Sequence, residues 1–164
     1  MKIFIIAGED SGDKLGAAII DGLRNALKNS PTFVGIGGTG MQSRGMNSIF
    51  PLSELSVMGF LEIASQYKNL KKRLNQTVSC ILDEQPDILL TIDAPEFCFR
   101  VAKRVKYLNK NIPIAHYVAP TVWAWRPKRA KKISYFIDHV LALFPFEPKY
   151  FHDVGLSCDF VGHP

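Results

Sequence analysis

The sequence has few cysteines and no long apolar run, and each absence excludes a class of protein. The three cysteines, Cys80, Cys98 and Cys158, form no CxxC pair, so the sequence predicts neither a disulfide framework nor a zinc site. We therefore expect a reducing, cytoplasmic setting. No apolar run reaches the roughly 18 residues that a membrane-spanning helix needs. The first apolar run has no basic segment before it and is interrupted by Glu9, which is typical of a strand and not of a signal peptide.

The bulk composition is that of one ordinary globular domain. The chain has 164 residues, of which 47% are hydrophobic, enough to bury a core. An excess of 20 Lys and Arg over 15 Asp and Glu gives a net charge of +5. This moderate positive charge indicates an anionic partner without naming it.

Short apolar runs alternate with amphipathic segments along the whole chain. We expect strands at Lys2–Ala7, Phe33–Ile36, Ser48–Phe50, Ile88–Ile92, Ile112–Val118, His139–Phe144 and Asp159–Val161. Helices are expected at Lys14–Leu27, at Val57–Ile63 with a longer one following to Asp83, and at Glu96–Leu108, Pro127–Phe136 and Glu147–Asp153. Because the strands are continuous apolar runs, the pattern predicts an α/β fold whose parallel sheet is covered by helices on both faces.

The segment Gly8–Asp13 joins the first strand to the first helix. Ligands of open α/β sheets bind where strand ends meet helix N-termini. Three carboxylates, Glu9, Asp10 and Asp13, lie in this segment and would repel a phosphate there. The segment is therefore expected to accept hydrogen bonds from sugar hydroxyls. The alternative is that its carboxylates only cap the helix that begins near Lys14.

The segment Gly35–Gly40 matches the pattern G-x-G-x-x-G after a strand. A dinucleotide site also needs a helix that starts at this point and an acidic residue about 20 positions further on. The following residues, 41–47, are too few and too glycine-broken for that helix. The pattern favours a glycine loop near a ligand, or a simple turn, over an NAD site.

Asp93 follows a strongly apolar strand, and Pro95 fixes the turn into the next helix. The carboxyl edge of a parallel sheet is where its ligands bind. Two interpretations stay open for Asp93. It caps the helix, or it acts as a general base on a bound hydroxyl.

Aromatic and basic residues are concentrated between His116 and Lys132. His116 lies within an expected strand, where a hydrogen-bonded core histidine is the more common case. Trp123 and Trp125 are followed by Arg126, Lys128, Arg129, Lys131 and Lys132. A solvated basic helix, nucleic-acid binding and an anionic membrane surface all fit this pattern, but no RNA-binding signature accompanies it. The apolar segment 57–63 is followed in the sequence by the cations of 68–73. It is either ordinary core or an exposed lipid-binding patch.

Taken together, these blocks resemble the lipid A disaccharide synthase family. The matching segments occur in the family's order and are Ala7–Asp13, Gly35–Gly38, Met58–Glu62, Ile92–Pro95, Tyr117–Arg126, Pro145–Glu147 and Phe160–His163. The resemblance implies a GT-B glycosyltransferase with two Rossmann-like domains, of which residues 1–164 match only the N-terminal, acceptor-binding one. The C-terminal domain that binds the UDP-sugar is expected to be absent from this chain, with a domain boundary near Gly162.

The activity implied by the resemblance joins UDP-2,3-diacylglucosamine to 2,3-diacylglucosamine 1-phosphate (lipid X). The products are a β-1′,6-linked lipid A disaccharide and UDP. The resemblance implies a peripheral location at the cytoplasmic face of the inner membrane and leaves open a homodimer of the full-length enzyme. We expect no cofactor, no metal and no nucleic-acid partner. We expect the isolated chain to show no substantial transferase activity.

The resemblance also implies roles for individual residues. Asp93 is the expected base for the acceptor's 6-hydroxyl. The expected substrate-binding residues are Glu9, Ser11, Gly12, Asp13, Gly37, Gly38, Met58, Glu62, Pro95, Trp123, Trp125 and Arg126. The expected membrane contacts are Phe60, Leu61, Lys68, Lys72, Arg129 and Lys132. Two hypotheses of other classes stay open, a non-catalytic lipid- or membrane-binding module and a nucleotide-binding oxidoreductase domain.

Overall fold

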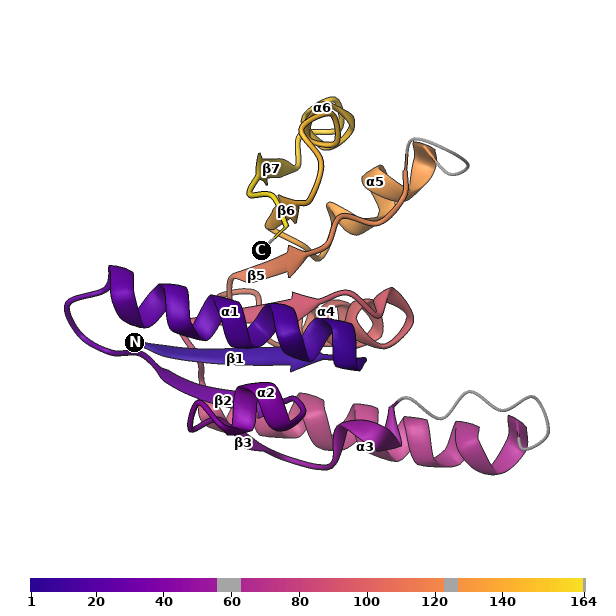
Figure 1. Cartoon of the computed structure of the whole chain (residues 1–164). Coiled ribbons are helices and arrows are strands. Elements are labelled where there is room, and N and C mark those ends of the chain that lie inside the picture. Colours follow the sequence, from indigo (N-terminus) through magenta and orange to yellow (C-terminus); the bar gives the residue numbers. More distant parts are fainter. Residues whose placement is uncertain (56–62, 123–126, 164) are drawn as a thin grey trace.

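A single parallel sheet organises the chain. The computed structural model describes residues 1–55, 63–122 and 127–163. Within these ranges seven strands lie in the order β3-β2-β1-β4-β5-β6-β7, and all neighbours are parallel. Their bounds are Lys2–Ala7 for β1, Thr32–Ile36 for β2, Asn47–Ser48 for β3, Ile88–Ile92 for β4, Ile114–Tyr117 for β5, His139–Ala142 for β6 and Ser157–Phe160 for β7. Figure 1 shows β2 and β3 on one side of β1 and the later strands on the other.

Helices connect the strands, as parallel pairing requires. Their bounds are Asp10–Ala26 for α1, Thr39–Gln42 for α2, Ile63–Glu84 for α3, Pro95–Leu108 for α4, Pro127–Ile133 for α5 and Pro148–His152 for α6. A single 3₁₀ turn, Leu52–Glu54, follows β3.

Two hydrophobic clusters show that both faces of the sheet are covered. Successive residues of β1 point to opposite faces. Phe4 and Ile6 belong to the cluster that packs against α3, α4, α5 and α6. Ile3 and Ile5 belong to the cluster that packs against α1 and α2. The predicted Rossmann-like α/β fold with a parallel sheet between helices is confirmed.

Some predicted boundaries were wrong. Helix α1 begins at Asp10 and not near Lys14, so Asp10 and Asp13 lie in its first turn, where carboxylates complement the helix dipole. Strand β7 begins at Ser157, which pairs with His139, and α5 ends at Ile133. The helix predicted over 57–63 lies almost wholly outside the described residues.

The direction of strand addition reverses at β1. Strand β2 lies on one side of β1 and β4 on the other, with Ala7 opposite Ile92. Ligands of open α/β sheets bind at such a switch point, beside the carboxyl ends of the strands. The segments after Ala7 and after Ile92 are the two that the sequence singled out.

Candidate functional site

The loops that follow β1 and β4 touch each other at the switch point. A Cβ atom at Gly8 would lie 2.1 Å from the Cβ atom of Ala94. Such a separation is impossible without a shift of the backbone, so Gly8 has to be glycine in this arrangement. The first loop is thereby held against the turn that carries Asp93.

Asp93 is half-buried and lies in an unusual backbone conformation. Its φ is 50° and that of Ala94 is 42°, both in the left-handed region, which costs about 1–2 kcal/mol for a residue with a Cβ atom. The Asp93 N–H donates to the carbonyl of Tyr117 at 3.0 Å. Strain of this kind concentrates at functional sites, where surrounding contacts maintain it.

The carboxylate of Asp93 does not cap α4. The N-cap position belongs to Ala94, and α4 has no side-chain cap hydrogen bond, so the capping alternative is wrong. Within the described part of the chain, Asp93 forms neither a side-chain hydrogen bond nor an ion pair. Burial and then the negative charge of Asp93 raise the pKa of the Cys98 thiol. Among the described residues, a ligand would therefore have no partner of the Asp93 carboxylate to displace.

Asp13 organises the glycine loop. It is only 5% exposed, and its Oδ1 atom accepts hydrogen bonds from the N–H groups of Gly38 at 2.8 Å and Met41 at 3.1 Å. Its Oδ2 atom accepts from the N–H of Gly40 at 2.8 Å. These bonds give Asp13 a structural role that the sequence did not predict, in ordering the glycine loop. Contact with substrate stays a prediction.

This pairing also explains the last glycine of the G-x-G-x-x-G pattern. A Cβ atom at Gly40 would lie 2.8 Å from Oδ2 of Asp13, as would one at the neighbouring Gly38, so both positions approach the carboxylate too closely for a larger residue. Sequence reasoning missed the pairing. The available signal was that a carboxylate on the inner face of a helix needs donors, and a glycine loop offers free N–H groups.

Glu9 and Ser11 present exposed side chains beside this loop. Glu9 occupies the N-cap position of α1 without a side-chain cap hydrogen bond. Gly12 is buried against the end of β1, since a Cβ atom there would lie 3.3 Å from that of Ala7. Of the residues in this segment that are predicted to bind a sugar, Glu9 and Ser11 are thus exposed to solvent.

His116 is a core histidine, as its position in a strand predicted. It is 1% exposed, and its Nδ1 atom lies 2.8 Å from the hydroxyl oxygen of Thr91. Burial first and then the positive charge of Arg129 lower the pKa of His116 to about 3. The imidazole is therefore neutral at physiological pH and joins β4 to β5 beneath the Asp93 turn.

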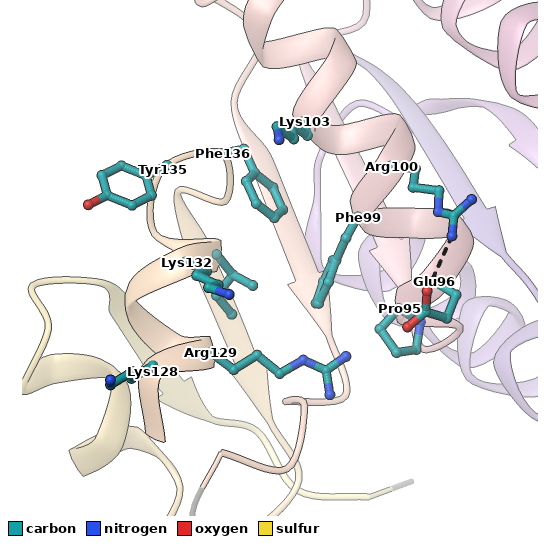
Figure 2. Close-up of a pocket in the computed structure, with 11 residues that line it drawn as sticks. Pro95, Glu96, Phe99, Arg100, Lys103, Lys128, Arg129, Lys132, Tyr135 and Phe136 are labelled. Atoms are coloured by element: carbon teal, nitrogen blue, oxygen red, sulfur yellow. Dashed lines mark ion pairs between the residues drawn. The ribbon is translucent and has the colours of Figure 1, made fainter. Parts of the chain in front are cut away.

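A groove of about 890 Å³ opens between α4 and α5 beside this turn. We call it the α4–α5 groove. The lining residues are Pro95, Glu96, Phe99, Arg100, Lys103, Lys128, Arg129, Lys132, Ile133, Tyr135 and Phe136. Figure 2 shows Phe99 and Phe136 between the two helices, with the cations around them. The structure thus brings Arg129 and Lys132 to the same opening as Pro95.

The other predicted contacts are not brought together with these. Lys68 and Lys72 are exposed on α3. Seven of the predicted residues lie outside the described residues: Met58, Phe60, Leu61, Glu62, Trp123, Trp125 and Arg126. Among the described helices, none has the length and apolar character needed to cross a membrane. Residues 1–55, 63–122 and 127–163 contain no group of three His, Cys, Asp or Glu side chains placed to hold a metal ion.

Comparisons with known proteins point to one family. Residues 3–164 match the family described as lipid-A-disaccharide synthetase. The lipid-A-disaccharide synthase of Rhodospirillum centenum is 51% identical and that of Ruegeria pomeroyi is 52% identical, each over 164 residues and all of this chain. The chain spans 41% and 40% of those two proteins, so it corresponds to less than half of their length.

A solved structure of another kind shares the fold. The UDP-GlcNAc 2-epimerase of Neisseria meningitidis, bound to UDP-GlcNAc, aligns with a TM-score of 0.62 at 13% identity. The alignment covers 95% of this chain and 43% of that one. At this identity the likeness concerns the Rossmann-like fold alone.

Proposed function

The chain belongs to the lipid-A-disaccharide synthase family, and from that premise we propose that it is the N-terminal, acceptor-binding domain of a lipid A glycosyltransferase. The full-length protein transfers 2,3-diacylglucosamine from UDP to 2,3-diacylglucosamine 1-phosphate. It releases UDP and forms the β-1′,6 linkage. In this proposal the UDP-sugar site belongs to the part of the full-length protein that this chain does not span.

Asp93 is the residue that we assign to the chemistry. The acceptor's 6-hydroxyl attacks the anomeric carbon of the donor as the bond to UDP breaks, and the hydroxyl proton passes to a base. One positioned carboxylate can serve as the general base of an inverting transfer, because UDP leaves as an anion and needs no separate acid. The observation that carries this assignment is the Asp93 carboxylate itself. It is half-buried, lacks a partner among the described residues and lies at the switch point in a left-handed turn.

The neighbouring loops fit a hydroxyl-rich ligand. Glu9 and Ser11 are exposed beside the turn and offer acceptors and a donor to sugar hydroxyls. Asp13 acts through Gly38 by fixing the glycine loop, and Gly37 lies in that loop. We place the full-length protein on the cytoplasmic face of the inner membrane, with the exposed cations Lys68 and Lys72 near anionic lipid.

Product formation tests this function. The full-length protein that carries this domain, mixed with UDP-2,3-diacylglucosamine and lipid X, is expected to yield a disaccharide 1-phosphate and an equal amount of UDP, measured by mass spectrometry and chromatography. The isolated chain is expected to form neither, because it lacks the donor half. Failure of the full-length protein to form the disaccharide, while folded, would contradict the proposal.

A further inference from the structure

The α4–α5 groove has a charge pattern that the chemistry assigned to Asp93 does not use. Five cations and one carboxylate line it. The carboxylate of Glu96 is already 3.6 Å from Arg100 on the same helix. Lys103, Lys128, Arg129 and Lys132 form no ion pair or side-chain hydrogen bond with any residue that the structure describes. Several unpaired cations around one opening attract an anion.

Three of these cations come from α5, within five residues of one another. Lys128 and Lys132 are exposed, and Arg129 between them is half-buried. Residues four apart lie on the same side of a helix. In Figure 2 Arg129 extends from α5 toward Phe99 on α4. A guanidinium in this position, with no carboxylate partner among the described residues, presents paired N–H donors to a phosphate.

The floor of the groove is apolar. Phe99 and Phe136 meet edge to face, with ring centroids 5.7 Å apart, and Ile133 lies beside them. The guanidinium carbon of Arg129 is 5.7 Å from the centroid of the Phe99 ring. Charged and hydrocarbon-binding surfaces are thus adjacent, which suits a ligand that carries both an anionic group and an alkyl chain.

The groove also begins at the turn that carries the proposed base. Pro95 lines it and follows Asp93 by two positions in the sequence. A sugar whose hydroxyl reaches Asp93 would therefore extend other substituents into the groove.

We propose that the α4–α5 groove binds a phosphate monoester carried on an acylated molecule, with Arg129, Lys128 and Lys132 around the phosphate and Phe99 and Phe136 against the hydrocarbon. We choose a phosphate monoester because it carries a charge of about −1.5 to −2 at pH 7. This charge is opposite in sign to the net excess of four cations that line the groove. Identifying the ligand with the phosphorylated acceptor sugar rests on the proposed function.

The binding test needs no turnover and uses this chain alone. Isothermal titration calorimetry with octyl phosphate, below its micellar concentration, is compared with inorganic phosphate and with octyl β-D-glucoside. Octyl phosphate is expected to bind at least about tenfold more tightly than either comparison ligand, because only it engages both surfaces.

Variants locate the site. Arg129→Gln and Lys132→Gln are each expected to weaken octyl phosphate binding about tenfold, the worth of one charge-assisted hydrogen bond. Lys28→Gln removes the same charge from an exposed position that does not line the groove and is expected to change binding less than twofold. Thermal unfolding of each variant checks the fold, and Lys132 is exposed enough to be replaced without loss of packing.

Several results would overturn this assignment. Equal losses in Arg129→Gln, Lys132→Gln and Lys28→Gln would show unspecific charge attraction. If octyl glucoside binds as tightly as octyl phosphate, the groove recognises only the hydrocarbon chain. If inorganic phosphate binds as tightly as octyl phosphate, the hydrocarbon chain contributes nothing to binding. If Arg129→Gln and Lys132→Gln bind octyl phosphate as tightly as the unmodified chain but bind phosphatidylglycerol vesicles more weakly, the groove is a membrane contact.

If octyl phosphate binds as expected but the full-length protein forms no disaccharide, the proposed function fails and the groove site stands.

Discussion

The carboxylate of Asp13 accepts a hydrogen bond of 2.8 Å from the N–H of Gly38, 25 positions further along the chain. Two more N–H groups, at the start of α2, also donate to it. This buried carboxylate joins α1 to the segment that follows β2, as the ion pair between Arg44 and Asp21 also does. The glycine loop and the first turn of α2 thus give three backbone hydrogen bonds to one side chain.

Replacing Asp13 by Asn is expected to lower the free energy of unfolding by about 2–3 kcal/mol, because a neutral amide offers one oxygen to three donors and turns its own N–H₂ toward them. Urea unfolding of the chain measures the loss. Asp10→Asn is the matched control, since Asp10 lies in the same helical turn but is exposed. Its loss is expected to stay below about 1 kcal/mol. Equal losses for the two variants would refute the role of Asp13.

The contact between Gly8 and Ala94 gives a second prediction. Gly8→Ala would place two Cβ atoms 2.1 Å apart and is expected to cost about 1–3 kcal/mol of stability through overpacking. Ala94→Gly is expected to be neutral or stabilising, since Ala94 has a φ of 42°. In the double variant most of the Gly8→Ala loss should disappear, giving a coupling above about 1 kcal/mol in a double-mutant cycle. Additive effects would contradict the contact.

His116 predicts a pH dependence of stability. Its pKa is lowered to about 3 in the folded chain, whereas an unfolded histidine titrates near 6.5. The unfolded state therefore binds a proton first, so stability is complete above about pH 6.5 and falls as the pH drops from there toward 3.

The measurement is urea unfolding of the chain and of His116→Asn between pH 7 and 5. Below pH 6 the chain's free energy of unfolding is expected to fall more steeply than that of the variant, by up to about 1.4 kcal/mol per pH unit. Parallel pH dependences would mean that His116 is not buried as a neutral side chain.

The cysteines are expected to differ in reactivity. Burial raises the pKa of Cys158 to about 12 and that of Cys98 still further, while half-exposed Cys80 is raised less. Because the thiolate is the reactive form, iodoacetamide at pH 8 should label Cys80 first. Cys98 and Cys158 should react only on unfolding, as peptide mass spectrometry would show. Early labelling of Cys98 would contradict its position beneath the Asp93 turn.

The sequence predicted the elements whose signal is local. Strands β1 and β4 have the predicted bounds, because a continuous apolar run buried on both faces needs no knowledge of its partners. The position of Asp93 at the carboxyl edge followed from the same signal. The predicted start of α1 was wrong because acidic residues are common both in a loop and in the first turn of a helix.

Non-local relationships could not be predicted in this way. The bonds from the glycine loop to Asp13 and the groove between α4 and α5 join segments about 25 to 40 positions apart. The sequence showed the basic residues of α5 but not the aromatic floor, because Phe99 and Phe136 come from different parts of the chain. Their meeting depends on the spatial order of the strands. Strands β4 and β5 are neighbours in the sheet, and the helices that follow them, α4 and α5, pack on the same face.

The central claim is that Asp93 takes the proton of the acceptor hydroxyl, and the turnover of Asp93→Asn in the full-length protein tests it most directly. UDP release at saturating donor and acceptor is expected to fall by about 10²–10⁴-fold, with unchanged thermal unfolding. The exposed Asp153→Asn is the control, and its turnover is expected to match that of the unmodified protein. Turnover of Asp93→Asn within tenfold of the unmodified protein would contradict the account.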